Sequence, residues 1–197
     1  MMAVNLKKIE GNWDIGYALD KHIISSVYTG DNQAGHPTFD TKRTDAGEAV
    51  FQLKYRSDWT QAPRLASAVV RHVVPLLGKI GLIVPMPASQ PRNRQPVTEV
   101  AVEIGKLLKI SVFSELLTKN AVPTANQSLK NLNSKAEKEA ALSGRFTIKD
   151  EISSAGKWNV LLLDDLFDTG ASMEAACLSL RTYAKIDKIF AVALTWK

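Results

Sequence analysis

The segment at residues 160–172 constrains the fold of this chain more than any other. Four apolar residues are followed by Asp164 and Asp165, and then by a turn that contains Gly170. Glycine accepts backbone conformations that other residues resist, so a buried strand can pass through this turn directly into a helix. The segment therefore predicts a strand, a tight turn and a helix that begins near residue 171.

The rest of the C-terminal two thirds repeats this alternation. Apolar residues at helical spacing alternate with short apolar runs bounded by glycine or proline. Apolar strands separated by helices are typical of a parallel sheet covered on both faces. The predicted fold is α/β, a Rossmann-like central parallel sheet of about five strands flanked by helices. We expect helices at residues 58–78, 96–109 and 171–184, and strands at residues 80–84, 111–117, 159–163 and 188–196.

The first 57 residues carry weaker patterns. Residues 22–28 favour a strand, residues 29–35 are a loop built of Gly, Asp and Asn, and residues 38–56 alternate only weakly. We interpret this region as irregular with short strands. The chain then divides into a small N-terminal hood, residues 1–57, and a core domain, residues 58–197.

The predicted turn and helix start offer hydrogen-bond donors to an anion. The first N–H groups of a helix have no partner within it, and the helix dipole favours negative charge there. Thr169 and Ser172 add hydroxyl donors. Two acids beside an anion site are explained if the phosphate is attached to a sugar. Carboxylates accept hydrogen bonds from ribose hydroxyls and can help to hold Mg²⁺.

Three other interpretations of this segment are a solvated strand end, a phosphatase motif and a P-loop. A solvated strand end beside a plain helix cap has the same residue types. A phosphatase of the haloacid dehalogenase type requires Asp-x-Asp followed by Thr, usually near the N-terminus, and this motif lacks that spacing. A P-loop requires Gly-x-x-x-x-Gly-Lys, which the sequence does not contain.

A second candidate segment is the proline-stiffened loop at residues 85–94, which ends in Arg92 and Arg94. Arginine suits bidentate contacts with phosphate. An ordinary turn with exposed arginines is the alternative. Ligands of open parallel sheets bind beyond the carboxyl ends of the strands. We therefore expect this loop and the loops after Leu117 and Leu163 to meet.

The segment at residues 160–172 resembles the signature of type I phosphoribosyltransferases that binds 5-phosphoribosyl-1-pyrophosphate (PRPP). That signature is four apolar residues, two acids, two variable residues, Asp or Thr, Thr, Gly, any residue, and Ser or Thr. The resemblance implies that Asp164 and Asp165 contact the ribose hydroxyls and Mg²⁺, and that Asp168 is a candidate base. It also implies that the 5-phosphate binds at Asp168, Thr169, Gly170, Ala171 and Ser172.

Within the family, the chain is most similar to the ComF-type (competence protein F) branch, over about residues 49–197. Its Val-Pro-Met-Pro loop with spaced arginines and its Leu-Lys-Tyr at residues 53–55 are similar to that branch. The resemblance implies pyrophosphate contacts from Pro85, Met86, Pro87, Ala88, Ser89 and Arg92. It also implies a mobile loop that includes Lys119, Gln127 and Lys135; a plain surface loop is the alternative.

The chain departs from the ComF-type branch in two places. That branch often begins with a four-cysteine zinc ribbon, whereas Cys177 is the one cysteine of this chain. Residues 95–97 read Gln-Pro-Val, where the branch often has Gly-Phe-Asn. Both departures argue against a role in DNA uptake. In place of a zinc ribbon, we expect residues 1–48 to form the hood that selects the acceptor.

The resemblance implies an enzyme that transfers the phosphoribosyl group of Mg–PRPP to a nitrogen acceptor. The rival interpretation is a non-catalytic protein on the same fold that senses PRPP or a nucleotide, or binds single-stranded nucleic acid. The net charge of +5 is compatible with both. With one cysteine and no apolar run long enough to span a bilayer, we expect a cytoplasmic protein with no membrane partner, possible as a homodimer.

Overall fold

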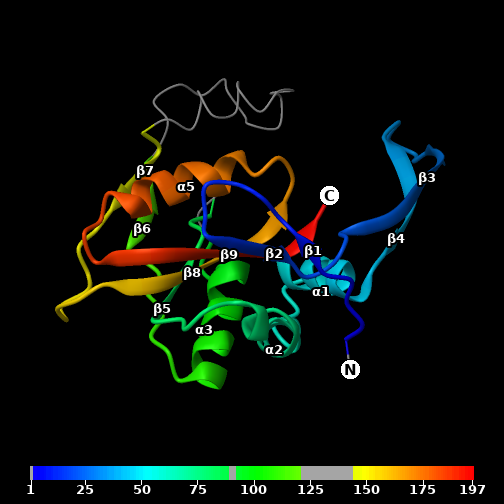
Figure 1. Cartoon of the computed structure of the whole chain (residues 1–197). Coiled ribbons are helices and arrows are strands. Elements are labelled where there is room, and N and C mark those ends of the chain that lie inside the picture. The colour runs from blue at the N-terminus through cyan, green and yellow to red at the C-terminus, as the bar shows by residue number, and fades with distance from the viewer. Residues whose placement is uncertain (1, 89–91, 121–143) are drawn as a thin grey trace.

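A five-stranded sheet forms the centre of the molecule (Figure 1). The computed structural model describes residues 2–88, 92–120 and 144–197. The strand order is β1-β2-β9-β8-β5; β1 is antiparallel to β2, and the other neighbours are parallel. The predicted α/β class is confirmed. The strands are β1 (Lys7–Lys8), β2 (Ile15–Ala18), β9 (Ile186–Trp196), β8 (Trp158–Phe167) and β5 (Leu82–Pro85).

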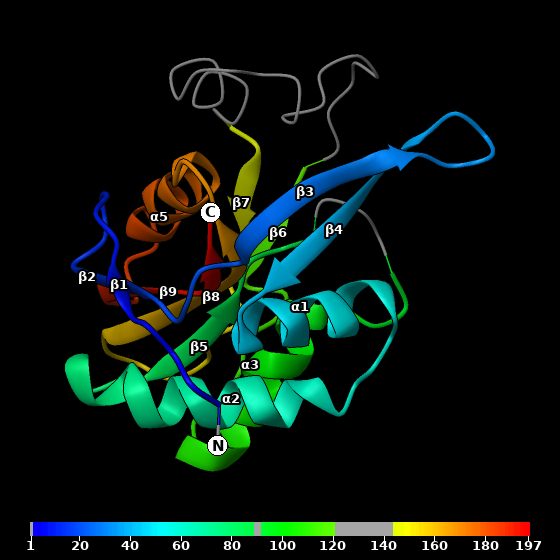
Figure 2. The ribbon, with the colours of Figure 1, turned by 90° about the vertical axis from the view of Figure 1, so that its right-hand side faces the viewer.

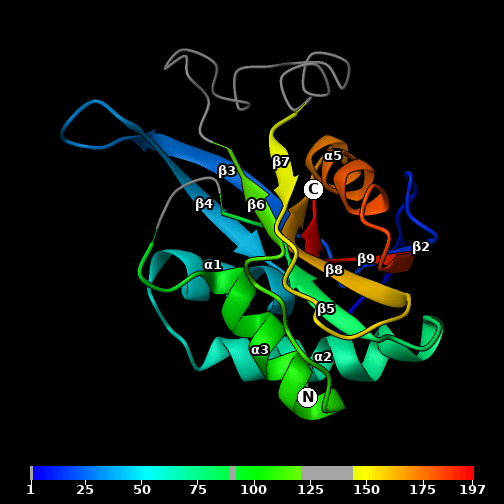
Figure 3. The ribbon, with the colours of Figure 1, turned by 90° about the vertical axis from the view of Figure 1, so that its left-hand side faces the viewer.

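Helices cover both faces of this sheet, as Figures 1 and 3 show. Neighbouring residues of a strand point to opposite faces. In β8, Leu161 and Leu163 belong to the cluster formed with α1, α2 and α3, whereas Val160 and Leu162 belong to the cluster formed with α5. The uninterrupted apolar run that predicted this strand is therefore buried on both sides. The helices are α1 (Asp45–Tyr55), α2 (Gln61–His72), α3 (Pro96–Leu108) and α5 (Ala171–Arg181).

Most of the predicted core elements are present, with changed ends. The helix expected at residues 58–78 is α2, followed by the short 3₁₀ helix η1 (Val74–Leu76), which contains Pro75. Proline removes a backbone donor and so interrupts an α-helix. The strand expected at residues 111–117 is wrong. Residues 111–113 run beside β5 through one parallel bridge, and the chain then turns at Ser114 and Glu115, which are both exposed.

The interpretation of residues 38–56 as irregular with short strands is wrong for its second half, which forms α1. Thr44 caps this helix, because its Oγ1 accepts a hydrogen bond from Gly47 N at 3.0 Å. The buried face of α1 consists of small and apolar residues at helical spacing. These are Ala46, Gly47, Ala49, Val50 and Leu53.

After β2 and before α1 along the chain, two strands form a hairpin that projects from the body of the molecule (Figure 2). Its strands are β3 (Ile23–Asp31) and β4 (Pro37–Arg43), so the strand expected at residues 22–28 is present and longer. Tyr28 and Phe39 pack edge to face across it at a centroid distance of 5.8 Å. Residues 2–57 thus contribute two strands to the central sheet, one helix and one projecting hairpin. The division of the chain at residue 57 stays a prediction.

A second hairpin lies on the side of the sheet that α5 covers. It consists of β6 (Leu117–Lys119) and β7 (Phe146–Ile148). Leu117 and Phe146 pack in the same cluster as α5. In the sequence, Ser134 and Glu137 could cap a short helix that reaches Leu142, but these residues lie outside the described part of the chain. Among the described helices, none is long and apolar enough to cross a membrane.

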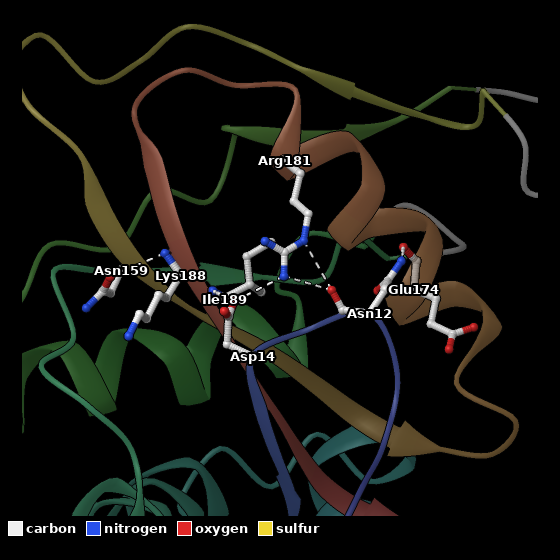
Figure 4. Close-up of polar contacts among 7 residues, drawn as sticks. All are labelled: Asn12, Asp14, Asn159, Glu174, Arg181, Lys188 and Ile189. Carbon is white, nitrogen blue, oxygen red and sulfur yellow. Dashed lines mark hydrogen bonds and ion pairs between the residues drawn. The ribbon is translucent and has the colours of Figure 1, made fainter.

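A polar clamp joins the N-terminal segment to α5 and β9 (Figure 4). The Arg181 guanidinium donates to Asn12 O at 2.9 Å and to Asp14 Oδ2 at 3.1 Å. The same Oδ2 accepts from Ile189 N at 2.8 Å, and Asp14 N donates to Ile189 O. Since Ile189 lies near the start of β9, this clamp fastens the amino end of the sheet and leaves the opposite end for other side chains.

Candidate functional site

The acidic pair lies within β8, which continues two residues beyond it. Asp164 is opposite Ala193 of β9 in the sheet register, and its Oδ1 accepts a hydrogen bond from Asp165 N at 2.8 Å. Burial raises the pKa of Asp164 to about 7, and the negative charge of Asp165 adds to the effect. At neutral pH the Asp164 carboxyl is therefore divided between its protonated and ionised forms.

Asp165 differs from its neighbour because it has a cationic partner. The Lys54 ammonium, from α1, forms a hydrogen-bonded ion pair with Asp165 Oδ2. Burial tends to lower the pKa of Lys54, but the charge and hydrogen bond of Asp165 outweigh burial and raise it above the usual value. Lys54 is therefore a charged group at neutral pH, held against one of the two acids.

Thr195 and His22 form a chain of hydrogen bonds that ends at the backbone of Asp165. Thr195 is fully buried, and its hydroxyl donates to Asp165 O at 2.8 Å. His22 Nδ1 lies 3.1 Å from the same hydroxyl oxygen. A hydroxyl has one hydrogen to donate, so Nδ1 must be the donor in this second bond. Burial, and then the charge of Arg43, lower the pKa of His22, which favours the neutral ring with its hydrogen on Nδ1.

Lys54 and His22 were not among the predicted site residues. Lys54 is 111 positions before Asp165, and no local pattern links residues so far apart. The signal that could have found it is the Leu-Lys-Tyr at residues 53–55, which is part of the resemblance to the ComF-type branch but does not by itself imply a role for the lysine. The helix that carries it was not recognised, so the direction of its side chain could not be inferred.

The predicted phosphate-binding segment forms the end of β8 and the start of α5. Gly170 is the N-cap of α5 with φ 84°, and no side chain hydrogen-bonds the first turn as a cap. A Cβ at this position would lie 3.0 Å from the Phe167 ring, so the positive φ and the contact both require glycine. Asp168 is exposed, and its carboxylate lies 3.7 Å from the Lys197 ammonium.

The predicted pyrophosphate loop follows β5 and meets β8. Met86 N donates to Leu163 O at 2.8 Å, which fixes the start of the loop beside the acidic pair. Pro85 and Met86 are buried, whereas Ala88 and Arg92 are exposed. Arg92 donates to the carbonyl oxygen of Lys54 at 3.0 Å, so the loop also reaches α1. Ser89 lies outside the described residues.

A pocket of about 360 Å³ lies between this loop and α1. Its lining contains three cationic side chains, and none of the described residues that line it is acidic. The Arg94 guanidinium lies 4.2 Å above the Trp59 ring and also donates to Glu99 Oε1 at 3.2 Å. Such a pocket suits an anion. The lining residues are Leu53, Lys54, Ser57, Trp59, Arg92, Asn93 and Arg94.

Lys119 is the one residue of the predicted mobile loop that the described residues include, and it ends β6. Burial lowers its pKa, the charge of Arg145 lowers it further, and Asp164 opposes both. Lys119 is thus within electrostatic reach of Asp164. Gln127 and Lys135 lie outside the described residues.

The described residues do not fit a resident Mg²⁺ ion by themselves. In the described part of the chain, no group of three or more His, Cys, Asp or Glu side chains is placed to hold a metal ion. Asp165 already contacts Lys54, and Asp164 is buried with a raised pKa. Mg²⁺ requires near-octahedral oxygen coordination, so a ligand and water would have to supply most of its oxygen atoms.

Comparison with known proteins gives similarity of structure but not of sequence. No protein-family model matches the chain, and no curated protein matches it. Among solved structures, adenine phosphoribosyltransferase from Thermoanaerobacter pseudethanolicus is 12% identical, covers 87% of this chain and 95% of its own, and has a TM-score of 0.42. Adenine phosphoribosyltransferase from Saccharomyces cerevisiae is 11% identical, covers 86% and 84%, and has a TM-score of 0.41.

A hypoxanthine phosphoribosyltransferase from Staphylococcus aureus is also similar, at 11% identity, with 71% of this chain and 65% of its own covered and a TM-score of 0.42. All three TM-scores are below 0.5. The case for function therefore depends on the arrangement of this chain's own residues at the carboxyl end of β8.

Proposed function

We propose that this protein is a phosphoribosyltransferase, which binds PRPP at the carboxyl end of β8 and transfers its phosphoribosyl group to a nitrogen acceptor. One observation carries the proposal. An acidic pair and a glycine-capped helix start are separated by four residues, and Lys54, the ion-pair partner of Asp165, also lines a cationic pocket between α1 and the loop after β5. A ligand with a phosphate at one end, a diol in the middle and a pyrophosphate at the other would match these three features in order.

Each part of PRPP has a proposed partner. The 5-phosphate binds the first turn of α5, from Asp168 to Ser172, where backbone N–H groups and the helix dipole favour an anion. The ribose hydroxyls donate to the carboxylates of Asp164 and Asp165. The pyrophosphate lies toward Arg92 and the loop after β5, as the Mg²⁺ complex in which PRPP is supplied.

The reaction breaks the bond between ribose C1 and the pyrophosphate oxygen, and the bonding electrons leave with pyrophosphate. Positive charge then develops on the ribose, and the two carboxylates stabilise it because they are fixed in place before the reaction. A nitrogen lone pair of the acceptor forms the new bond at C1. The proton that this nitrogen loses passes to a base, for which Asp168 is the candidate because it is exposed beside the phosphate segment.

The acceptor is a nucleobase or an amine, and the β3–β4 hairpin is the proposed selecting element. It stands beside the carboxyl end of the sheet in Figure 2 and carries exposed Ile24, Val27, Tyr28 and Phe39. Apolar and aromatic side chains of this kind suit a flat base more than a small polar amine. The similarity to the ComF-type branch, a cytoplasmic location and a homodimer stay predictions.

The test of this function is pyrophosphate release from PRPP and Mg²⁺ with a panel of nucleobases and amines. We expect one acceptor class to give turnover that Asp164→Asn/Asp165→Asn lowers at least about 100-fold. Asp187→Asn is the control for the substitution itself, because it replaces an exposed aspartate near the start of β9 by asparagine. Turnover that the acidic-pair variant retains would contradict the proposal.

A second candidate function is binding of single-stranded nucleic acid without catalysis. The observation in its favour is the cationic pocket, in which Arg94 lies on Trp59, together with the net charge of +5. Tight oligonucleotide binding that weakens steeply with salt, without pyrophosphate release from any acceptor, would favour this candidate.

A further inference from the structure

The acidic pair already has a cation of the protein's own. Lys54 contacts Asp165 Oδ2, one of the two carboxylate oxygens that a divalent metal ion could bind. The side chains of Lys54 and Asp165 are only 30% and 16% exposed. This ion pair is therefore less exposed than, for example, the pair of Lys106 and Glu103 on α3, in which the lysine side chain is 65% exposed.

Three contacts fix Lys54 in this place. Its neighbour Leu53 is 1% exposed and belongs to the main core cluster, which holds the last turn of α1 against the sheet. Arg92 donates to the carbonyl oxygen of Lys54. Thr195 fixes the partner, because its hydroxyl binds the backbone of Asp165. The ammonium is thus positioned by the packing of α1 in the core on one side and by the buried Thr195, through Asp165, on the other.

A divalent ion has little else to bind here. Mg²⁺ and Mn²⁺ are held in proteins chiefly by several oxygen ligands at short distances. In the described residues around the pair, no third carboxylate, histidine or cysteine completes such a set. A metal ion on Asp165 Oδ2 would have to displace the ammonium, and one on Oδ1 would lie close enough to be repelled by it.

We propose that Lys54 is the permanent counter-ion of the acidic pair and keeps divalent metal ions off it while no ligand is bound. Mg²⁺ then enters this site only with a phosphorylated ligand whose own oxygens hold it. The inference rests on the proposed function for the identity of that ligand. The exclusion of metal is a property of the protein alone and is tested without PRPP.

The experiment is a Mn²⁺ titration of the whole protein without PRPP, with free Mn²⁺ measured by electron paramagnetic resonance. Lys54→Met keeps the length and apolar stem of the side chain but removes its charge. We expect this variant to bind one Mn²⁺ at least about tenfold more tightly than the wild type, because a bare carboxylate replaces an ion pair. Asp164→Asn/Asp165→Asn in the Lys54→Met background should abolish the gain, which would locate the metal at the pair.

Two controls separate this result from general effects of charge. Lys54→Arg retains a cation at the site and should bind Mn²⁺ as weakly as the wild type. Lys106→Met frees Glu103 on the surface of α3 and should also match the wild type. Circular dichroism establishes that each variant is folded. Equal Mn²⁺ affinity of the wild type and Lys54→Met would overturn the proposal, and so would tight binding of one Mn²⁺ by the wild type. A wild type that excludes Mn²⁺ but fails to bind PRPP would leave this inference standing and remove the proposed function alone.

Discussion

Asp164 and Asp165 have the same side chain and adjacent positions, but their surroundings give them different properties. Asp165 has an ammonium partner, whereas the hydrogen bond that Asp164 accepts within the described part of the chain comes from a backbone N–H. A carboxyl group that is buried without a cationic partner is unfavourable when ionised. Asp164 is therefore expected to lower the stability of the fold at alkaline pH, which is a common property of residues kept for function.

Replacement of Asp164 by asparagine tests this expectation. The folded-state pKa of about 7 is above the unfolded value near 3.8, so the folded protein binds the proton more tightly. Its stability must then fall as pH rises from about 4 to 7. Asn keeps the acceptor for Asp165 N but cannot ionise. We expect Asp164→Asn to be more stable than the wild type by up to about 4 kcal/mol at pH 8.

The pH dependence of that difference is the measurement. Urea unfolding at pH 8 and pH 4 should give a gain for Asp164→Asn at pH 8 that shrinks to a small fraction at pH 4, where the carboxyl is protonated in the folded protein and partly protonated in the unfolded chain. Asp187→Asn, at an exposed position, should show no such pH dependence. An equal gain at both pH values would mean that ionisation of Asp164 is not the cause.

The residues that the sequence predicted are those whose role is visible in a short segment. Gly170 was recognised because a strand that turns directly into a helix requires a positive φ, which it has. Asp164 and Asp165 were recognised because acids rarely follow an apolar run directly. Lys54, His22 and Thr195 were missed, because only the sheet and α1 bring them to Asp165 from positions far along the chain.

At the scale of elements, α1 is the helix that brings the Lys54 ammonium to the acidic pair. The sequence did not predict this helix because its buried face is made of small residues, while the β-favouring Val50, Phe51 and Tyr55 suggest a strand. Packing overrides that local preference, since Ala49, Val50 and Leu53 bury together against the sheet. The long apolar strands and the helix α3, in contrast, have strong patterns and were predicted well.

The N-cap of α1 gives a prediction at this scale. Thr44 Oγ1 accepts from Gly47 N at 3.0 Å and donates to Lys21 O at 2.5 Å, so one hydroxyl joins the helix start to the end of the sheet. Thr44→Ala should lower the free energy of unfolding by about 1 kcal/mol, whereas Thr44→Ser should be nearly neutral because it keeps the hydroxyl. Chemical denaturation measures both. A loss for Ser as large as that for Ala would show that the methyl group, and not the cap, stabilises this junction.

At the scale of the whole molecule, the two ends of the sheet differ, because one end carries structural contacts and the other carries the candidate site. The amino end is fastened by the clamp of Arg181 and Asp14, and the carboxyl end gathers Lys54, Lys119 and the acidic pair. None of the clamp contacts could be predicted, because they join residues more than 160 positions apart. The fold class could be predicted, since it follows from the order of the strands and helices alone.

The clamp predicts a loss of stability without a loss of the site. Asp14→Ala removes the acceptor of Ile189 N and the partner of Arg181, and should lower the free energy of unfolding by about 1 to 2 kcal/mol. Asp14→Asn keeps an acceptor oxygen and should lose less. Asp187→Ala is the control for the loss of one acid near this end of the sheet. If thermal unfolding shows no difference between Asp14→Ala and Asp187→Ala, the clamp contributes nothing to stability.

The central claim is that the carboxyl end of β8 is a PRPP site, and calorimetric titration of PRPP with Mg²⁺ tests it most directly. We predict binding of one PRPP in the micromolar range, lost by at least about tenfold in Asp164→Asn/Asp165→Asn and kept in Asp187→Asn. No heat of binding with folded wild-type protein would contradict the account, and so would PRPP binding that the acidic-pair variant retains in full.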